Sequence, residues 1–235
     1  MKKKKALAAI VAVALICCIA AGASLAYLQD KTTVAENTFT LGKVDIKLDE
    51  TKLDDKGEPT DERTEEGNDN YHLLPGQTVT KDPVVTVLAN SEECYVRAFV
   101  TLDHAKEFLE VYRAHGMSIA KALEFFGGIS EDWTAQNLGM AAYDEAKNTI
   151  TVEFRYNETV KTSEEDQRLD AIVDTVTLPS WVNNTDTEKV PDGFTVTVYA
   201  EAIQAKGFDD ADAAWAEFDS TVDPYVVPTS TTTDP

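Results

Sequence analysis

The protein has 235 residues, of which 42 are acidic and 21 are lysine or arginine, giving a formal net charge of −21 at pH 7. A negative field of this size disfavours binding to nucleic acid and to anionic lipid surfaces. The length is typical of one ordinary domain with tails.

The first 26 residues have the pattern of a secretory signal peptide. Four lysines follow the initiator Met, residues 6–21 are uncharged and apolar, and small residues stand at Ala23, Ser24 and Ala26. A cut after Ala23 and a cut after Ala26 both fit the small-x-small rule. An uncleaved membrane anchor is the alternative, but the apolar stretch is shorter than the about 20 residues that a spanning helix needs. We therefore expect a secreted protein that meets the membrane only through its uncleaved signal segment.

Cys94 is the only cysteine after the signal segment, so the secreted chain cannot form an intramolecular disulfide. It opens a strand-like run that continues to Val100. We expect a small buried or half-buried thiol at this position.

Most of the chain after the signal segment has the alternating apolar pattern of β-strands. In the first of these runs the apolar phase changes at Gly42, where a bulge would return the apolar side chains to one face. The expected strands are 36–50, 79–88, 94–102, 140–143, 150–156, 172–178 and 194–205.

Two short helices are expected between and after these strands. Asp103 would cap the first, and Asp209 or Asp210 would cap the second, whose apolar residues form one stripe over 211–218. Ser118 is expected to start one or two further helical turns.

The acidic segment 50–70 has almost no apolar residue and is expected to be a solvated loop. Residues 27–228 then form a single mainly antiparallel β-sandwich with short helical excursions. A free N-terminal arm, 27–37, precedes it, and the polar tail 229–235 is expected to be disordered.

The sequence carries no catalytic signature. There is no H-E-x-x-H motif, and the three histidines are His72, His104 and His115. His104 begins an inverted zinc motif, H-x-x-E-H, but Phe108 stands where the second histidine would be. Ser118 lies in a G-x-S-x-A run, but helical residues precede it, so it is better interpreted as a helix cap. We expect no catalytic, metal or cofactor site.

Four stretches, in this order along the chain, resemble the family of exported proteins that are cut by a SipW-type signal peptidase, which includes TasA and camelysin. The stretches are SLAYLQD (24–30) with NTFTLG (37–42) and VDI (44–46); LPGQTVTKD (74–82); VTLP (176–179); and AEAIQA (200–205) leading to Trp215.

The resemblance implies a cut after Ala26, so that the secreted chain starts at Tyr27, and it implies a jelly-roll-like β-sandwich. It also implies a SipW-type signal peptidase as a partner. In TasA-like members the N-terminal strand of one subunit completes the sheet of the next and builds matrix fibres. The residues that would form this strand here are Tyr27, Leu28, Val34, Phe39 and Leu41.

The sequence therefore predicts a secreted, non-enzymatic structural protein of the cell surface or biofilm matrix, which associates with itself or with related matrix proteins. Two alternatives stay open. Camelysin-like members are described as surface metalloproteases, although this sequence has no recognisable zinc motif. A monomeric surface adhesin or binding module is the other alternative.

Overall fold

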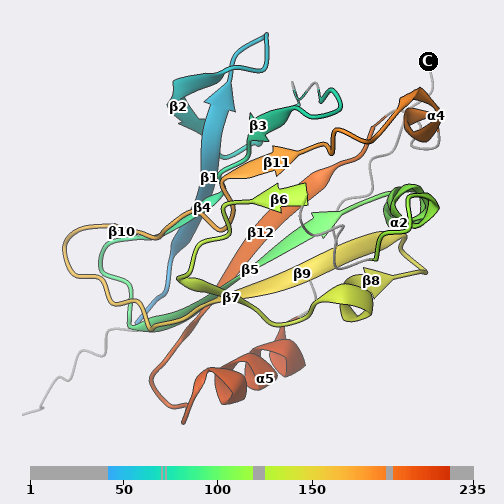
Figure 1. Ribbon diagram of the computed structural model, residues 1–235. Coiled ribbons are helices and arrows are strands. Elements are labelled where there is room, and N and C mark those ends of the chain that lie inside the picture. The colour runs from blue at the N-terminus through green and yellow to red at the C-terminus, as the bar shows by residue number, and fades with distance from the viewer. Residues whose placement is uncertain (1–41, 70, 72, 119–124, 189–192, 223–235) are drawn as a thin grey trace, which may run out of the picture. The chain divides into compact units, whose positions relative to one another are not determined.

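The computed structural model describes residues 42–69, 71, 73–118, 125–188 and 193–222, which form a mainly antiparallel β-structure (Figure 1). The signal segment, the arm 27–37, the helical start after Ser118 and the tail 229–235 lie outside the described residues. No described helix is long and apolar enough to cross a membrane.

The described residues form three sheets. The first has the strand order β10-β4-β1-β2, from β1 (Ile46–Leu53), β2 (Pro59–Thr64), β4 (Val84–Val87) and β10 (Gln167–Arg168). The second has the order β3-β11-β6, from β3 (Thr78–Thr80), β6 (Phe126–Gly127) and β11 (Thr175–Thr177). The third has the order β12-β5-β9-β7, from β5 (Cys94–Leu102), β7 (Trp133–Ala135), β9 (Thr149–Tyr156) and β12 (Val196–Gln204), and β8 (Tyr143–Asp144) also pairs with β9.

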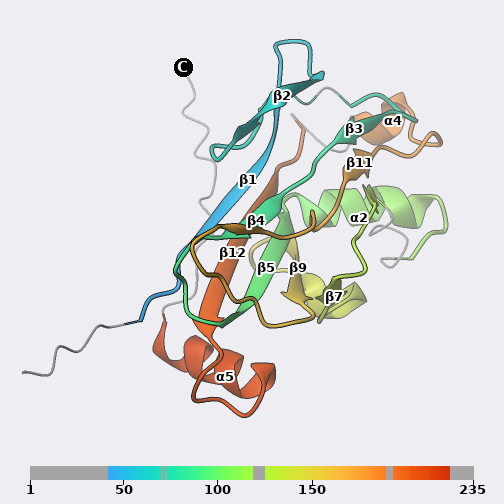
Figure 2. The same cartoon turned by 90° about the vertical axis from the view of Figure 1, so that its left-hand side faces the viewer.

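The helices are short and lie outside the sheets. They are α2 (Ala105–Ala114), the 3₁₀ helix η2 (Gly139–Ala142), α4 (Asn184–Thr187) and α5 (Ala211–Thr221). In both views α2 and α5 lie far apart, with the third sheet between them (Figure 2).

The core is built on the inner face of the third sheet. Alternate residues of β5 are almost completely buried, from Cys94 through Val96, Ala98 and Val100 to Leu102. Side chains from β4, β9, β11 and α2 pack against them. The buried thiol expected at Cys94 is confirmed, and burial raises the pKa of Cys94 to about 11.

Helix α5 packs on the outer face of the same sheet, and its main contact there is with the side chain of Arg97. Arg97 of β5 is only 4% exposed, and its guanidinium carbon lies 4.3 Å from the centroid of the Trp215 ring. The guanidinium also forms ion pairs with Glu201 of β12 and Asp219 of α5. The Asp210 carboxylate caps α5 by accepting a hydrogen bond from the Ala213 backbone N–H, as expected.

Strands 94–102 and 150–156, both with a long apolar alternation, are found as β5 and β9, and strand 194–205 as β12. Strand 79–88 is instead divided into β3 and β4, which belong to different sheets. The division falls at Pro83, which has no N–H to donate to a sheet ladder.

The acidic segment 50–70 differs most from its expectation as a solvated loop. It contains the end of β1 and the whole of β2, which pair as antiparallel neighbours. Strand 36–50 correspondingly starts only at Ile46 in the described residues and runs on to Leu53. Glu50 is buried there because it pairs with a lysine from a distant segment.

Three smaller elements also differ. Residues 140–143 are mainly the 3₁₀ helix η2, and strand 172–178 shortens to β11. His104, with a left-handed backbone, precedes α2 in place of Asp103. The Asp103 carboxylate instead accepts a hydrogen bond from the backbone N–H of Thr195, just before β12.

Candidate functional site

The free edge of β12 is the first feature of the candidate site. In an antiparallel pair, alternate residues exchange both backbone hydrogen bonds and the others point theirs away. Backbone bonds join Asp103 to Thr195 and Ala205 to Glu93 at the two ends of the β5–β12 ladder. The odd-numbered residues of β12 therefore bond to β5, and the even-numbered ones present their N–H and C=O groups at the other edge. Among the described residues, no second strand pairs with that edge.

Strand β1 has a similar edge over its first half. The backbone N–H of Leu88 donates to the carbonyl of Asp45, so the odd-numbered residues of β1 bond to β4. Ile46 and Leu48 then point their backbone groups away from β4. Strand β2 occupies that side only from Glu50 onward.

The two edges border one groove, because β1 runs beside β12 (Figures 1 and 2). The groove has a volume of about 450 Å³, and Leu48 and Glu50 line it on one side and Thr195 to Val198 on the other. It continues into a hollow of about 860 Å³ beneath α2.

The walls of the groove are partly apolar. Leu48 of β1 and Val196 and Val198 of β12 line the groove, turn toward the core and are only partly buried. The core is therefore incompletely covered along this line, which is the side that an added strand would cover.

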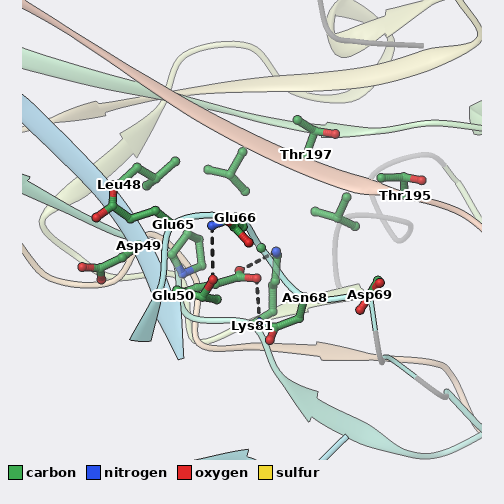
Figure 3. A pocket seen from close by; sticks show the side chains of 15 residues that line it. Leu48, Asp49, Glu50, Glu65, Glu66, Asn68, Asp69, Lys81, Thr195 and Thr197 are labelled. Atoms are coloured by element: carbon green, nitrogen blue, oxygen red, sulfur yellow. Dashed lines mark hydrogen bonds and ion pairs between the residues drawn. The ribbon is translucent and has the colours of Figure 1, made fainter. Parts of the chain in front are cut away.

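The floor of the groove is polar, and the Glu50 carboxylate binds both Lys81 and Asn68 there (Figure 3). The pleat of β1 turns Glu50 to the same side as Leu48. One Glu50 oxygen accepts from Lys81 Nζ at 2.5 Å, and the other accepts from Asn68 Nδ2 at 2.8 Å. Lys81 and Glu50 are 7% and 4% exposed, so both charges are almost fully withdrawn from water.

A second charged cluster lies on the opposite face of β1. Arg63 of β2 binds the carboxylates of Asp49 and Asp82, and Thr51 donates to Asp82 through its N–H and its hydroxyl. Burial alone would raise the pKa of Asp49, but hydrogen bonds from Arg63 and Lys47 outweigh it and lower that pKa. The pKa of Asp82 is likewise lowered, because the bonds from Arg63 and Thr51 outweigh burial.

The expected site residues at the N-terminus cannot be placed on the groove. Ala26, Tyr27, Leu28, Val34, Phe39 and Leu41 all lie outside the described residues. His104 and His115 stand at the two ends of α2, and His115 Nε2 lies 2.9 Å from Asp186. Within the described ranges, no group of three or more His, Cys, Asp or Glu side chains is arranged to hold a metal ion.

Sequence reasoning missed the polar floor completely. Lys81 was included only in the strand-like stretch after the Pro-Gly turn, and Glu50 and Asn68 only in the acidic segment. The one sequence feature that marks this place is Lys81, which stands directly before Asp82-Pro83, where the proline interrupts the strand. Nothing in the local pattern pairs that lysine with Glu50, which lies 31 residues earlier.

Comparison with family models, curated proteins and solved structures gave no match to this chain.

Proposed function

We propose that this protein is a secreted structural subunit of the cell surface or biofilm matrix, which assembles when the N-terminal segment of one copy adds as a strand to the groove of the next. The observation that carries the proposal is the groove itself, where the edge of β12 and the first half of the edge of β1 pair with no other described strand and lie beside partly buried core side chains. We also infer that the sheets form a jelly-roll-like sandwich, which the inserted strand would extend from β1 to β12.

The chemistry of the N-terminal segment fits this groove. Phe39 and Leu41 alternate in sequence, so in a strand both would turn to one face. That face would lie against Leu48, Val196 and Val198. Burying each apolar side chain contributes about 1.5–3 kcal/mol, and backbone pairing with both edges adds about 1 kcal/mol per hydrogen bond.

The route of the described chain favours insertion into a second copy. Residues 43–45 already continue the line of β1, since the carbonyls of Lys43 and Asp45 accept from Glu92 and Leu88. Leu48 and Glu50 of β1 line the groove. The chain thus enters β1 at the end that is remote from the groove. To enter its own groove the preceding segment would have to reverse at Gly42, whereas a neighbour's segment meets no such demand.

The proposal is tested by deleting residues 27–41, which removes the arm together with Phe39 and Leu41, with deletion of 229–235 as the matched control. We expect the first variant to stay a folded monomer by light scattering and circular dichroism, while the control assembles like the unaltered protein. Fibres of unchanged number and width from the first variant, seen on electron micrographs, would refute strand addition.

A peptide of residues 27–41 gives a second test on the arm-deleted monomer. It should bind, and the same peptide with Phe39→Asp and Leu41→Asp should not. A protein that never assembles at any salt or pH would favour the monomeric adhesin. Chelator-sensitive cleavage of casein by a zinc-containing preparation would favour the metalloprotease.

A further inference from the structure

Lys81, Glu50 and Asn68 form a cluster that strand addition does not use. A primary amine and a carboxamide are held against the two oxygens of one carboxylate, at 2.5 Å and 2.8 Å (Figure 3). An ion pair needs only the lysine and the glutamate. The carboxamide on the second oxygen adds an electrophilic carbon to the cluster.

The Asn68 side chain is held in a single orientation by its hydrogen bonds. Its Nδ2 donates to Glu50 and to the carbonyl of Thr51, at 2.8 Å and 2.9 Å. Its Oδ1 accepts from the backbone N–H of Leu53 at 2.8 Å. An N–H that donates to a carbonyl oxygen also stabilises the negative charge that forms there when a nucleophile adds to the carbon. Asn68 Nδ2 also lies next to the Glu50 carboxyl group, which can give it a proton once Glu50 is protonated.

Lys81 and Glu50 of this cluster are shielded from water, and Asn68 is partly buried. The ring of Tyr71 lies with its centroid 5.6 Å from Lys81 Nζ. Burial, followed by the negative charge of Glu50, raises the pKa of Tyr71 well above its ordinary value. Lys81 Nζ and a Glu50 carboxylate oxygen lie within hydrogen-bond distance and are both almost fully buried, so a proton can pass directly between them.

We propose that Lys81 and Asn68 are joined by an isopeptide bond that the folded protein forms by itself, with Glu50 as the catalytic proton carrier. Glu50 first takes a proton from the Lys81 ammonium. The neutral amine then attacks Asn68 Cγ, and the oxygen charge is held by the Leu53 N–H.

The second half of the reaction releases ammonia. Glu50 gives its proton to the Asn68 nitrogen, the Cγ–Nδ2 bond breaks, and the carbonyl of the new amide forms again. Glu50 then takes a proton from the newly bonded Lys81 nitrogen and passes it to the departing ammonia, so the carboxylate is regenerated. The balance is one ammonium and one primary amide converted to one secondary amide and one ammonium ion, with no oxidant or cofactor. The bond would tie the segment after β2 to the residue directly after β3, across the floor of the groove.

The decisive measurement is the intact mass of the purified, denatured protein. We expect it to be lower than the sequence mass by one ammonia. Chymotrypsin, which cleaves at Tyr71 between the two residues, should then release a pair of peptides that stay joined. A full sequence mass after prolonged incubation of the folded protein would overturn the proposal, whatever the variants do.

The variant Glu50→Gln keeps both reacting groups but cannot carry the proton, so it should retain the ammonia and yield separate peptides. Glu62→Gln is the matched control, because Glu62 is exposed and pairs only with exposed Lys52 among the described residues. It should form the bond normally. Loss of ammonia without joined peptides would indicate a cyclic imide at Asn68 and would also overturn the proposal. None of these outcomes depends on whether the protein assembles.

Discussion

Replacing Arg97 by Met tests whether the C-terminal helix is held by a buried cation. The guanidinium lies under Trp215 and pairs with Glu201, whose carboxylate is 2.6 Å from the terminal nitrogen and whose side chain is only 15% exposed. Met retains much of the apolar packing beneath Trp215, so the packing term stays below about 1.5 kcal/mol. The main loss is electrostatic, since Glu201 would remain buried without its partner.

Breaking a buried ion pair from one side costs about 3–5 kcal/mol, while the exposed partner Asp219 adds at most about 1 kcal/mol. We therefore expect Arg97→Met to lower the free energy of unfolding by about 3–5 kcal/mol. Adding Glu201→Gln removes the unpaired charge and should recover about 1–3 kcal/mol of that loss. This recovery separates an electrostatic cause from simple loss of packing.

The assay is urea unfolding followed by tryptophan fluorescence at concentrations where the protein is monomeric. With a denaturant slope of about 1–3 kcal/mol per molar, the midpoint of Arg97→Met should fall by at least about 1 M. Lys52→Met is the control, because its ion pair with Glu62 is exposed and screened by water, so the midpoint should hardly move. A loss for Arg97→Met no greater than that of the control would refute the reasoning.

Two further outcomes follow from the edge geometry and the buried carboxylates. In the monomer, hydrogen exchange at the amides of Val196 and Val198 should be much faster than at Thr197, and assembly should slow it; equal protection in the monomer would mean that the assigned edge is wrong. The fold lowers the pKa values of Asp49 and Asp82. The two carboxylates therefore contribute fully to stability above the pKa values that they have in the unfolded chain, and this contribution is lost as the pH falls through their pKa values in the folded protein. Unfolding at acid pH should therefore be less steep with pH in the double variant Asp49→Asn, Asp82→Asn, and an unchanged acid profile would contradict the assignment.

The elements that sequence could predict are those whose signal is local. Strand β5 was found with its exact bounds because its alternate residues are apolar over nine positions. Helix α5 was found because an Asp cap precedes an apolar stripe. In both elements the spacing of the apolar residues follows from burial of one face of the strand or helix, and this spacing can be read from a single sequence.

The polar floor could not be predicted because its signal is not local. Glu50 lies in a segment whose composition is typical of a solvated loop, and it is buried only because it meets a partner of opposite charge. Lys81 reaches Glu50 across 31 residues of chain. Composition rules treat such residues as exposed, since charges are rarely buried unless they are paired.

The position of β12 at the end of the chain has a consequence for when the protein can fold. Strand β5 pairs along its full length with β12, and Arg97 finds its carboxylates 104 and 122 residues further on. Contacts this distant in sequence form late, because a long loop must close before they contribute. The central sheet therefore cannot be completed until Val196–Gln204 is available. For the export that we propose, this order would keep the chain unfolded while it crosses the membrane and allow it to fold only once it is outside.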